Sequence, residues 1–219
     1  MKTYTVTLME RKWLSSSAFE VALDYPESFQ FRAGQNIRFI HQGRHRHYCP
    51  VSAPDENPLV LCVSYLENGW FSNILAESRI GSEFIVSGPH GYFMFSPSSR
   101  QPVFIATCTG IAPFVSMVRD GVRDFILFHG VRHEKDLFYR ELLLEASERY
   151  VPRIWGVDRL QPSARRLFQD AMEKTLPAGQ DNATFDFYLC GWEKMIKDVM
   201  DMIDERYPGS LVYNEIFYT

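Results

Sequence analysis

The sequence has few cysteines, and they do not form close pairs. Cys49, Cys62, Cys108 and Cys190 are scattered along 219 residues, with no C-x-x-C spacing. Zinc sites and cysteine-ligated iron–sulfur clusters usually show such pairs, and disulfide frameworks belong to small, cysteine-rich secreted domains. We therefore expect no metal site, no disulfide framework and a cytoplasmic location.

Basic charge and long hydrophobic runs are also scarce. The chain has 23 lysines and arginines against 27 acidic residues, a net charge of −4, whereas nucleic-acid binding needs a basic surface. The one long uncharged stretch, residues 101–118, contains Pro102, Gly110 and Pro113. It predicts a buried strand, a turn and a helix start rather than a membrane span. The N-terminus shows no apolar signal core, so we expect neither nucleic-acid binding nor membrane insertion.

What the sequence does contain is enough apolar material for a core. Apolar residues make up 46% of the chain and aromatic residues 15%, a composition typical of folded globular proteins. At about 100–200 residues per domain, the length fits one large domain or two small ones. The aromatic content is compatible with binding of planar ligands and equally with a packed core.

The first hundred residues predict a β-domain. Several segments carry β-branched or aromatic residues in partial alternation and are bounded by Gly, Pro, Asn or Ser. A short helix is expected at residues 70–77, and the polar, proline-bounded stretch 96–102 has the composition of a linker. Strands at this spacing favour an antiparallel barrel or sandwich. The expected strands are residues 3–9, 18–24, 35–41, 59–66 and 83–87.

After residue 100 the pattern changes to strands that alternate with helices. Such alternation predicts a parallel sheet covered on both faces. The expected strands are residues 103–106, 125–129, 151–155, 185–190 and 211–217. The expected helices are residues 112–119, 137–149, 164–175 and 193–206.

Residues 43–50 (GRHRHYCP) form the first candidate binding segment. Strand alternation puts Arg44, Arg46 and Tyr48 on one side and His45 with His47 on the other. Two arginines beside a tyrosine suit a phosphate and a flat ring. The histidines lack a third metal ligand at a suitable spacing. A solvated edge strand is the alternative interpretation.

Residues 67–73 (ENGWFSN) form the second candidate. A glycine followed by the first turn of a helix leaves backbone N–H groups free to bind an anion. Ser72 or Asn73 would add a side-chain donor. An ordinary turn with a helix cap explains the pattern equally well.

Residues 105–113 (IATCTGIAP) give the strongest local signal. A buried strand ends in small residues, turns at Gly110 and starts a helix near Pro113. At the carboxyl edge of a parallel sheet, such a turn lets the pyrophosphate of a dinucleotide approach the backbone. The segment is not G-x-G-x-x-G, so the usual dinucleotide fingerprint is absent, and a plain strand–helix turn remains the alternative.

Two further strand ends are expected at the same edge of the sheet. Gly130 and Arg132 follow one strand, and Cys190 and Gly191 follow another. Ligands of open α/β sheets bind at such carboxyl ends, so these residues are candidates for one crevice. A buried free cysteine is often just a small apolar residue, which is the alternative for Cys190 and also for Cys62.

In this order, the segments resemble motifs of the ferredoxin–NADP reductase-like flavoprotein family. Residues 46–49 (RHYC) are similar to its R-x-Y-[ST] flavin motif, and residues 69–72 (GWFS) to its G-x-x-S diphosphate motif. Residues 88–93 (GPHGYF) resemble its G-P-x-G-x-F barrel element, and residues 107–113 (TCTGIAP) its G-G-T-G-I-A-P nicotinamide-site turn.

The rest of the resemblance lies toward the C-terminus. Residues 130–132 (GVR), with Asp136 and Tyr139 beyond, resemble the G-x-R…D…Y stretch of the family. Residues 190–195 are similar to its C-G-x-x-x-M motif, and residues 215–217 (EIF) to its terminal E-x-[FY]. The resemblance therefore spans nearly the whole chain.

The resemblance implies a two-domain fold. Residues 1–97 would form an antiparallel Greek-key β-barrel that binds FAD. Residues 102–219 would form a parallel five-stranded α/β sandwich that binds NAD(P)H, with the flavin between the two domains.

The resemblance also implies roles for individual residues. Tyr48 would stack on the isoalloxazine, and Arg46 with the helix start at Ser72 would neutralise the phosphates. Cys49, Cys190 and Glu215 are the implied catalytic residues beside flavin N5. The implied cofactor-binding residues are Arg46, His47, Tyr48, Cys49, Val63, Tyr65, Gly69, Trp70, Phe71, Ser72, Asn73, Thr109, Gly110, Pro113, Gly130, Arg132, Cys190, Gly191 and Phe217, with Tyr218 as an alternative to Phe217.

The chain departs from the family pattern at two places. Cys49 stands where the family usually has Ser or Thr, and a thiol is a weaker hydrogen-bond donor than a hydroxyl. Thr107 and Cys108 replace two glycines, which narrows the turn that follows the strand.

The choice between NADH and NADPH stays open on the sequence. Asp158 suits a ribose hydroxyl and therefore NAD. Arg153 or Arg159 would favour the 2′-phosphate of NADP.

The resemblance implies a flavoprotein reductase. It would take hydride from NAD(P)H onto bound FAD and pass electrons to a separate acceptor such as a ferredoxin or an oxygenase component. Two alternatives are a reductase that releases free reduced flavin and a non-catalytic flavin-binding subunit. We expect a monomer or a weak oligomer.

Overall fold

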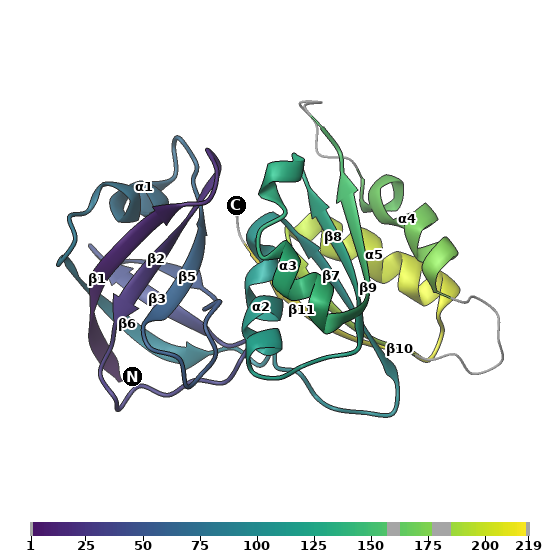
Figure 1. The fold of residues 1–219 in the computed structure, drawn as a ribbon, viewed down its shortest axis with the longest axis horizontal. Helices are drawn as coiled ribbons and strands as arrows, with labels where there is room; N and C mark the ends of the chain where they lie inside the picture. The colour runs from purple at the N-terminus through teal and green to yellow at the C-terminus, as the bar shows by residue number, and fades with distance from the viewer. Residues whose placement is uncertain (1, 157–162, 177–184, 218–219) are drawn as a thin grey trace. The chain divides into compact units, whose positions relative to one another are not determined.

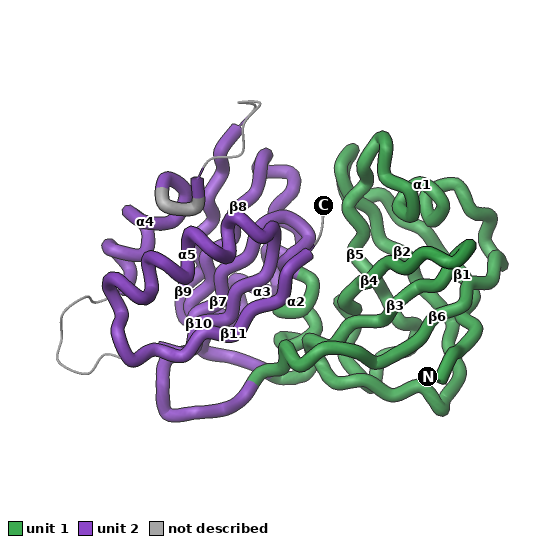
Figure 2. The backbone as a smooth tube through the Cα atoms, turned by 180° about the vertical axis from the view of Figure 1, so that it is seen from behind, with its two compact units in different colours: residues 1–95, 112–121 green, residues 96–111, 122–219 purple. Residues whose placement is uncertain are grey.

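The computed structural model describes residues 2–156, 163–176 and 185–217. The chain forms two compact units, one of residues 1–95 with 112–121 and one of residues 96–111 with 122–219 (Figure 2). Helix α2 (Ala112–Arg119) thus belongs to the first unit, although the expected second domain begins at residue 102. It is held there by Ser116, whose Oγ donates to the carbonyl of Ser52 at 2.7 Å.

The first unit is built on one antiparallel sheet (Figure 1). Its strands are β1 (Thr3–Trp13), β2 (Ala18–Asp24), β3 (Asn36–His41), β4 (Arg44–Tyr48), β5 (Leu59–Ser64) and β6 (Glu83–His90). They are ordered β4-β3-β6-β1-β2-β5, and a bridge between Pro50 and Leu61 joins the two ends of that order. The prediction of an antiparallel barrel is confirmed.

Two strands run further than the sequence predicts. Strand β1 continues past residue 9 to Trp13 because a register shift between Leu8 and Glu10 inverts the alternation there. Strand β6 continues past residue 87 through Gly88-Pro89, and His90 pairs with Asn36 of β3. A local irregularity in each strand interrupts the alternation of apolar and polar residues, so this alternation does not predict the continuation of the strand.

Helix α1 (Trp70–Glu77) covers the core of the first unit. Phe71 and Leu75 are buried, and the Phe71 ring lies 4.9 Å from that of Phe39 on β3. Arg11 of β1 donates from Nη1 to the carbonyl oxygens of Leu75 at 3.2 Å and Ser78 at 2.7 Å. Since helix C-termini leave carbonyl groups unpaired, Arg11 ties β1 to the end of α1.

The second unit is built on a parallel sheet, as predicted. Its strands are β7 (Gln101–Thr107), β8 (Phe125–Val131), β9 (Ser147–Ile154), β10 (Phe185–Gly191) and β11 (Leu211–Ile216). In the order β11-β10-β7-β8-β9, the chain winds outward from β7 to β9 and then returns to β10 on the other side of β7. The carboxyl ends of β7 and β10 therefore form the topological switch point, where open α/β sheets bind ligands.

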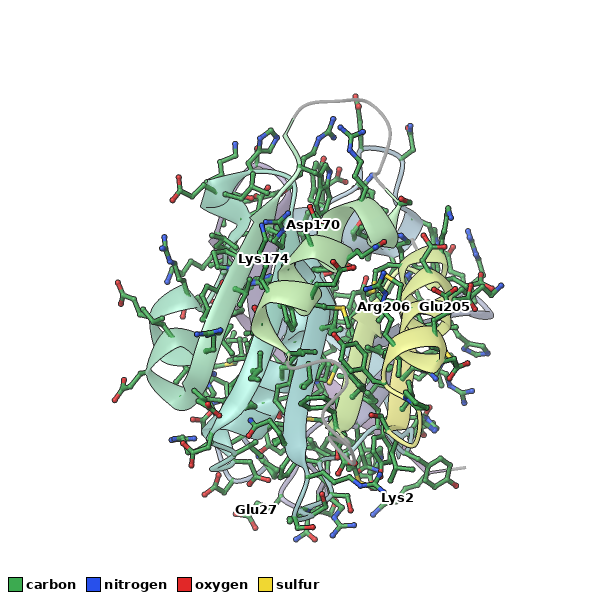
Figure 3. The ribbon with its side chains drawn as sticks, turned by 90° about the vertical axis from the view of Figure 1, so that its right-hand side faces the viewer. Lys2, Glu27, Asp170, Lys174, Glu205 and Arg206 are labelled. Carbon is green, nitrogen blue, oxygen red and sulfur yellow. The ribbon has the colours of Figure 1, made fainter. Side chains whose placement is uncertain are left out.

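Helices α4 (Ala164–Thr175) and α5 (Glu193–Arg206) cover one face of this sheet, and α3 (Arg140–Ala146) lies on the other (Figure 1). Two short 3₁₀ turns, η1 (Cys108–Ile111) and η2 (Glu134–Asp136), follow β7 and β8. The charged side chains of Asp170, Lys174, Glu205 and Arg206 lie on the outer sides of α4 and α5 (Figure 3).

The helix predicted at residues 137–149 is too long at both ends. Helix α3 covers only Arg140–Ala146, and β9 begins at Ser147, which pairs with Phe125 of β8. The polar residues 147–149 (SER) continue the charged face of the preceding helical pattern, but pairing with β8 decides their conformation.

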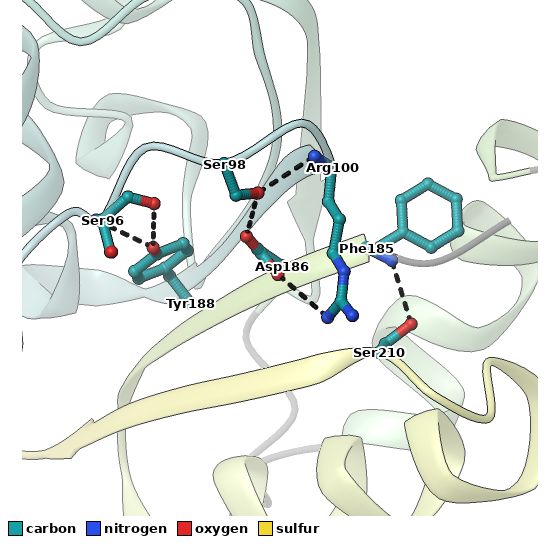
Figure 4. A network of polar contacts seen from close by, with 7 residues as sticks. All are labelled: Ser96, Ser98, Arg100, Phe185, Asp186, Tyr188 and Ser210. Carbon is teal, nitrogen blue, oxygen red and sulfur yellow. Dashed lines mark hydrogen bonds and ion pairs between the residues drawn. The ribbon is translucent and has the colours of Figure 1, made fainter.

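The expected linker at residues 96–102 is bound to the second unit. The Ser96 N–H donates to Tyr188 Oη at 3.1 Å, and Ser98 Oγ donates to Asp186 Oδ2 at 2.6 Å (Figure 4). Arg100 Nη1 lies 3.5 Å from Asp186 Oδ1. These contacts hold the segment that leads into β7 against β10.

The described residues contain four free cysteines. In the same residues, no cluster of three or more His, Cys, Asp or Glu side chains has the arrangement of a metal site. Within the part of the chain that the structure describes, no helix has both the length and the apolar character to cross a bilayer.

Candidate functional site

Strand β4 presents Arg44, Arg46 and Tyr48 on the side of α1, as its alternation predicts. The Arg44 guanidinium lies 4.1 Å from the centroid of the Trp70 ring. The Tyr48 ring lies 6.2 Å from that of Phe71. Burial raises the pKa of Tyr48 to about 12, with Arg46 nearby opposing the shift. The phenol therefore stays protonated and can stack or donate a hydrogen bond.

His47 lies on the opposite side of β4 from Arg46 and Tyr48. Its Nδ1 shares a hydrogen bond with Asn36 Oδ1 at 2.8 Å, and its ring lies 5.8 Å from that of His90. Partial burial lowers the pKa of His47, and the positive charges of His90 and Arg38 lower it further. The structure thus does not bring the His47 ring together with the other expected flavin ligands of β4.

The start of α1 has the features of an anion site. Gly69 precedes the helix, and a Cβ at this position would lie 2.3 Å from Ser72 Oγ and 2.9 Å from Leu66 Cβ, so glycine is required there. Ser72 Oγ is buried and has no hydrogen-bond partner. A buried hydroxyl without a partner costs about 1–3 kcal/mol, and a phosphate oxygen beside a helix N-terminus would supply the partner.

Asn73 adds to the same turn. Its Nδ2 donates to the carbonyl of Glu67 at 2.9 Å, while its Oδ1 is buried without a partner. The residues present at this end of α1 therefore fit the diphosphate of a dinucleotide cofactor.

The remaining expected flavin contacts of the first unit are buried or lie at its edge. Cys49 is 2% exposed, and its Sγ donates to the carbonyl of Gln35 at 3.2 Å. Val63 is fully buried in the core. The Tyr65 ring lies 5.2 Å from that of Trp13, at the tip of the β1–β2 hairpin.

At the switch point of the second unit, two turns pack backbone against backbone. A Cβ on Gly110 would lie 2.5 Å from the carbonyl oxygen of Cys190. Gly191 has φ +153°, and a Cβ there would lie 2.1 Å from Thr107 Oγ1. Glycine is therefore needed at both positions for the turns after β7 and β10 to meet.

Thr107 fills the space between two glycines. Its Oγ1 faces Gly191, and its Cγ2 lies 3.2 Å from the position of a Cβ on Gly130. Thr107 is 2% exposed, and its hydroxyl has no hydrogen-bond partner. The Thr107 side chain lies between Gly130 of β8 and Gly191 of β10, and it narrows the turn after β7 as expected.

Cys108 adopts the left-handed conformation, with φ +50°. This is the backbone geometry that a glycine favours, and here an L-residue accepts it. Burial raises the pKa of the Cys108 thiol to about 12, and Asp136 adds to the rise while Arg132 opposes it. The thiol is therefore protonated and unreactive at neutral pH.

The C-terminal strand and the residue that follows it bring two expected residues, Glu215 and Phe217, to the Cys190 turn. Cys190 is fully buried and pairs with Glu215 across β10 and β11. The Phe217 N–H donates to the carbonyl of Gly191 at 2.9 Å. Thr109 lies in η1 beside Gly110, whereas Pro113 is buried in α2, in the first unit.

Of the residues expected to select between NADH and NADPH, Arg153 lies within the described part of the chain. Arg153 Nε donates to the carbonyl of Leu167 on α4 at 2.8 Å. Asp158 and Arg159 lie outside the described residues, as does Tyr218.

The environment of His129 is a feature that the sequence does not reveal. This histidine of β8 is fully buried, and its Nδ1 shares a hydrogen bond with Tyr150 Oη at 3.0 Å. Burial lowers its pKa to about 4, partly opposed by the backbone of Cys108. Its place inside an otherwise apolar strand, FILFHGV, is the signal that could have revealed it.

Two family models match the chain. An oxidoreductase FAD-binding domain matches residues 5–95, and an oxidoreductase NAD-binding domain matches residues 104–201. The first covers β1–β6 with α1, and the second covers the parallel sheet from β7 to β10. The start of α1 lies within the FAD-binding match, and the turns after β7 and β10 lie within the NAD-binding match.

Individual proteins are also similar. Ferredoxin–NADP reductase B of Sorangium cellulosum is 32% identical over 197 residues, which is 80% of either chain. The anthranilate 1,2-dioxygenase electron transfer component of Acinetobacter baylyi is 30% identical, and the match covers 78% of this chain but 53% of that protein.

A solved ferredoxin–NADP⁺ reductase from Neisseria gonorrhoeae with bound FAD and NADP has the same fold, with a TM-score of 0.82, 21% identity and full coverage of both chains. The two domain-model matches and the 32% identity to the Sorangium protein together identify the family of this chain. The chain belongs to the ferredoxin–NADP reductase family of FAD- and NAD-binding oxidoreductases.

Proposed function

We propose that this chain accepts hydride from NAD(P)H onto bound FAD and passes the electrons to a separate acceptor protein. The observation that carries the proposal is the buried, unpartnered Ser72 hydroxyl at the glycine-led start of α1. This hydroxyl can donate a hydrogen bond to the flavin diphosphate, and it lies in the unit that matches the FAD-binding model.

The proposed flavin ligands of the first unit contact different parts of the cofactor. Tyr48 supplies a ring to stack on the isoalloxazine, and Arg46 beside it supplies positive charge for the phosphates. Ser72 and Asn73 supply polar side chains at the diphosphate, with Gly69 leaving room for it. Trp70 and Phe71 fix the face of α1 against β3 and β4.

We propose supporting roles for the other expected residues of this unit. The fully buried Val63 shapes the wall behind the ring, as does the edge residue Tyr65. His47 contributes its backbone, because its ring is engaged with Asn36. Cys49 follows Tyr48 directly and places its thiol in the buried part of the site.

In the second unit, the proposed nucleotide ligands surround the switch point. Thr109 and Gly110 form the turn after β7, Gly130 and Arg132 lie at the end of β8, and Cys190 with Gly191 forms the turn after β10. Glu215 and Phe217 reach this turn from β11. Pro113, the second residue of α2, belongs to the first unit and is proposed as a nucleotide ligand on the resemblance alone.

The chemistry itself belongs to the cofactor, since a bound flavin takes two electrons as hydride and releases them one at a time. The residues of this chain bind and orient the two nucleotides. Cys49, Cys190 and Glu215 are the proposed catalytic residues; the proposal is supported by their match to the family's motifs and by the pairing of Cys190 with Glu215 across β10 and β11.

The acceptor is proposed from the relatives. One is named a ferredoxin–NADP reductase and another an electron transfer component of a dioxygenase. We propose a ferredoxin or an oxygenase component as the partner, and a monomer or weak oligomer in the cytoplasm. The domains are proposed to span residues 1–97 and 102–219, which is supported by the matches over 5–95 and 104–201.

Anaerobic stopped-flow mixing with NADH and with NADPH tests the proposal. The purified protein should be yellow, and one of the two nucleotides should bleach the flavin absorbance rapidly. A coloured protein that neither nucleotide bleaches would make it a flavin-binding subunit. A colourless protein that turns over only with added flavin would make it a free-flavin reductase.

A further inference from the structure

We propose that His129, oriented by Tyr150, is a positioning residue for the turn after β7, and that it supports Cys108 in the left-handed conformation on which this turn depends. This role rests on the proposed function, since it concerns a turn that would bind NAD(P)H. It concerns a polar pair of β8 and β9 that the proposed chemistry does not use.

Cys108 has a backbone conformation that needs support. It is the first residue of η1 and follows directly on the end of β7. Its φ of +50° lies in the left-handed region, where a residue other than glycine is strained unless its surroundings hold it. The neighbouring residues leave it little freedom, because Thr107 lies between two glycines of β8 and β10, and Gly110 packs against the carbonyl of Cys190.

His129 lies beside this strained residue. In the register of the sheet it pairs with Ala106 of β7, two residues before Cys108. Burial lowers the pKa of His129 to about 4, and the backbone of Cys108 opposes that shift. A backbone group raises the pKa of a histidine when its carbonyl oxygen attracts a ring N–H. The Cys108 carbonyl therefore faces the imidazole.

Tyr150 determines which nitrogen of His129 carries the proton. Its Oη lies 3.0 Å from Nδ1. Burial raises the pKa of Tyr150 to about 12, so the phenol keeps its proton and donates it to Nδ1. The neutral imidazole then carries its own proton on Nε2, which is left to face the Cys108 carbonyl. Nε2 is buried and forms no well-aligned hydrogen bond, so no competing acceptor engages it.

The strands β7, β8 and β9 lie side by side in this order (Figure 1), so Tyr150 acts on the turn after β7 through His129. Without the imidazole, Cys108 would leave the left-handed region part of the time. The turn would then be formed in only a fraction of the molecules, and the apparent nucleotide affinity would fall by that fraction. Glycine adopts the left-handed conformation without strain. The dependence on His129 should therefore exist only while a residue other than glycine stands at position 108.

The test is a double-mutant cycle on the protein with its flavin. We would measure the Kd of NAD⁺ and of NADP⁺ by calorimetry for the wild type, His129→Leu, Cys108→Gly and the double variant. Leucine fills a volume similar to that of histidine and offers no N–H. In the wild-type background, His129→Leu should weaken nucleotide binding about tenfold. In the Cys108→Gly background, it should weaken binding less than about twofold.

Two controls separate the conformation of residue 108 from other effects. Cys108→Ala removes the thiol and keeps a side chain, so His129→Leu should still weaken binding about tenfold in this background. Phe128→Leu changes the preceding residue of β8, which is fully buried on the opposite face of the strand. Its effect on nucleotide binding should be the same with Cys108 and in the Cys108→Gly background.

Tyr150→Phe covers the case in which His129→Leu does not fold. It removes only the hydroxyl that donates to Nδ1, and it should weaken nucleotide binding about threefold in the wild-type background and not in the Cys108→Gly background. Equal effects of these variants in the two backgrounds, or no effect in either, would overturn the positioning role of His129.

Failure of the proposed function would look different. If the wild type binds neither NAD⁺ nor NADP⁺, the switch point is not a nucleotide site. The positioning role of His129 is then measured by urea denaturation of the same four proteins. His129→Leu should raise the unfolding equilibrium constant about tenfold more in the wild-type background than in the Cys108→Gly background. An equal rise in both backgrounds would overturn the role.

Discussion

Thr107 stands where the central strand of the parallel sheet ends, and its side chain lies between Gly130 and Gly191. The methyl group fills space beside β8, while the hydroxyl faces Gly191 without a partner. Such a hydroxyl reduces the stability of the protein without nucleotide, and stability is often given up in this way at sites that bind ligands.

Thr107→Val removes the unpartnered hydroxyl and keeps the shape of the side chain. We expect it to raise the free energy of unfolding by about 1 kcal/mol, measured by urea denaturation without nucleotide. Ser116→Ala is the matched control, since it removes a buried hydroxyl that is paired, donating to Ser52 at 2.7 Å. The control should lose about 1 kcal/mol. A loss of stability in Thr107→Val as large as in the control would show that the Thr107 hydroxyl has a partner.

His129 makes the stability of the second unit depend on pH. Its pKa is lowered from 6.5 to about 4 in the folded protein, chiefly by burial. Between these values the unfolded state binds more protons, so stability rises with pH and is lost as the pH falls from 6.5 toward 4. The full loss is roughly 3 kcal/mol.

His129→Gln removes this titration and keeps a polar group near Tyr150. Urea denaturation at a series of pH values should give a flatter pH dependence in this window for His129→Gln than for the wild type. His45→Gln, at an exposed position of β4, should keep the slope of the wild type. Equal slopes in all three proteins would mean that His129 does not cause the pH dependence.

At the scale of elements, the second unit depends on how closely η1 approaches the turn after β10. Gly110 lies so near Cys190 that a Cβ would come within 2.5 Å of its carbonyl oxygen and within 2.9 Å of Gly191 Cα. These are backbone atoms, and they cannot move away as a side chain can. This contact therefore limits how far apart the two turns of the proposed nucleotide site can lie.

Gly110→Ala should push the two turns apart. We expect the free energy of unfolding to fall by about 1–3 kcal/mol and the affinity for NAD(P)⁺, measured by calorimetry, to fall with it. The flavin content provides an internal control, because the proposed flavin ligands lie in the other unit and should keep their cofactor. Unchanged nucleotide affinity would show that the approach of η1 to β10 does not shape the site.

At the scale of the whole molecule, the sequence predicts those features that depend on local periodicity. Helices α1, α2, α4 and α5 begin and end at the predicted residues, because each combines an apolar face with clear boundaries. The order of strands and helices after residue 100 likewise predicts the parallel sheet, which is confirmed. On β4, alternation alone places Arg46 and Tyr48 on the same side.

The features that the sequence does not reveal depend on contacts between distant residues. Nothing near Arg11 in the sequence indicates that it holds the end of α1, and nothing near Thr107 indicates that Gly130 and Gly191 enclose it. The start of β9 at Ser147 is likewise decided by its neighbour β8, against a local pattern that favours a helix. The roles of the individual site residues stay predictions for the same reason.

We propose that the unit of β1–β6 holds the flavin and that NAD(P)H reduces this flavin directly. Anaerobic bleaching of the flavin by NAD(P)H carrying deuterium at the transferred position tests both parts. We expect rapid bleaching that is slower with the deuterated nucleotide, and loss of the flavin in Arg46→Ala. A flavin that is not reduced by either nucleotide, or is retained in full by Arg46→Ala, would contradict it.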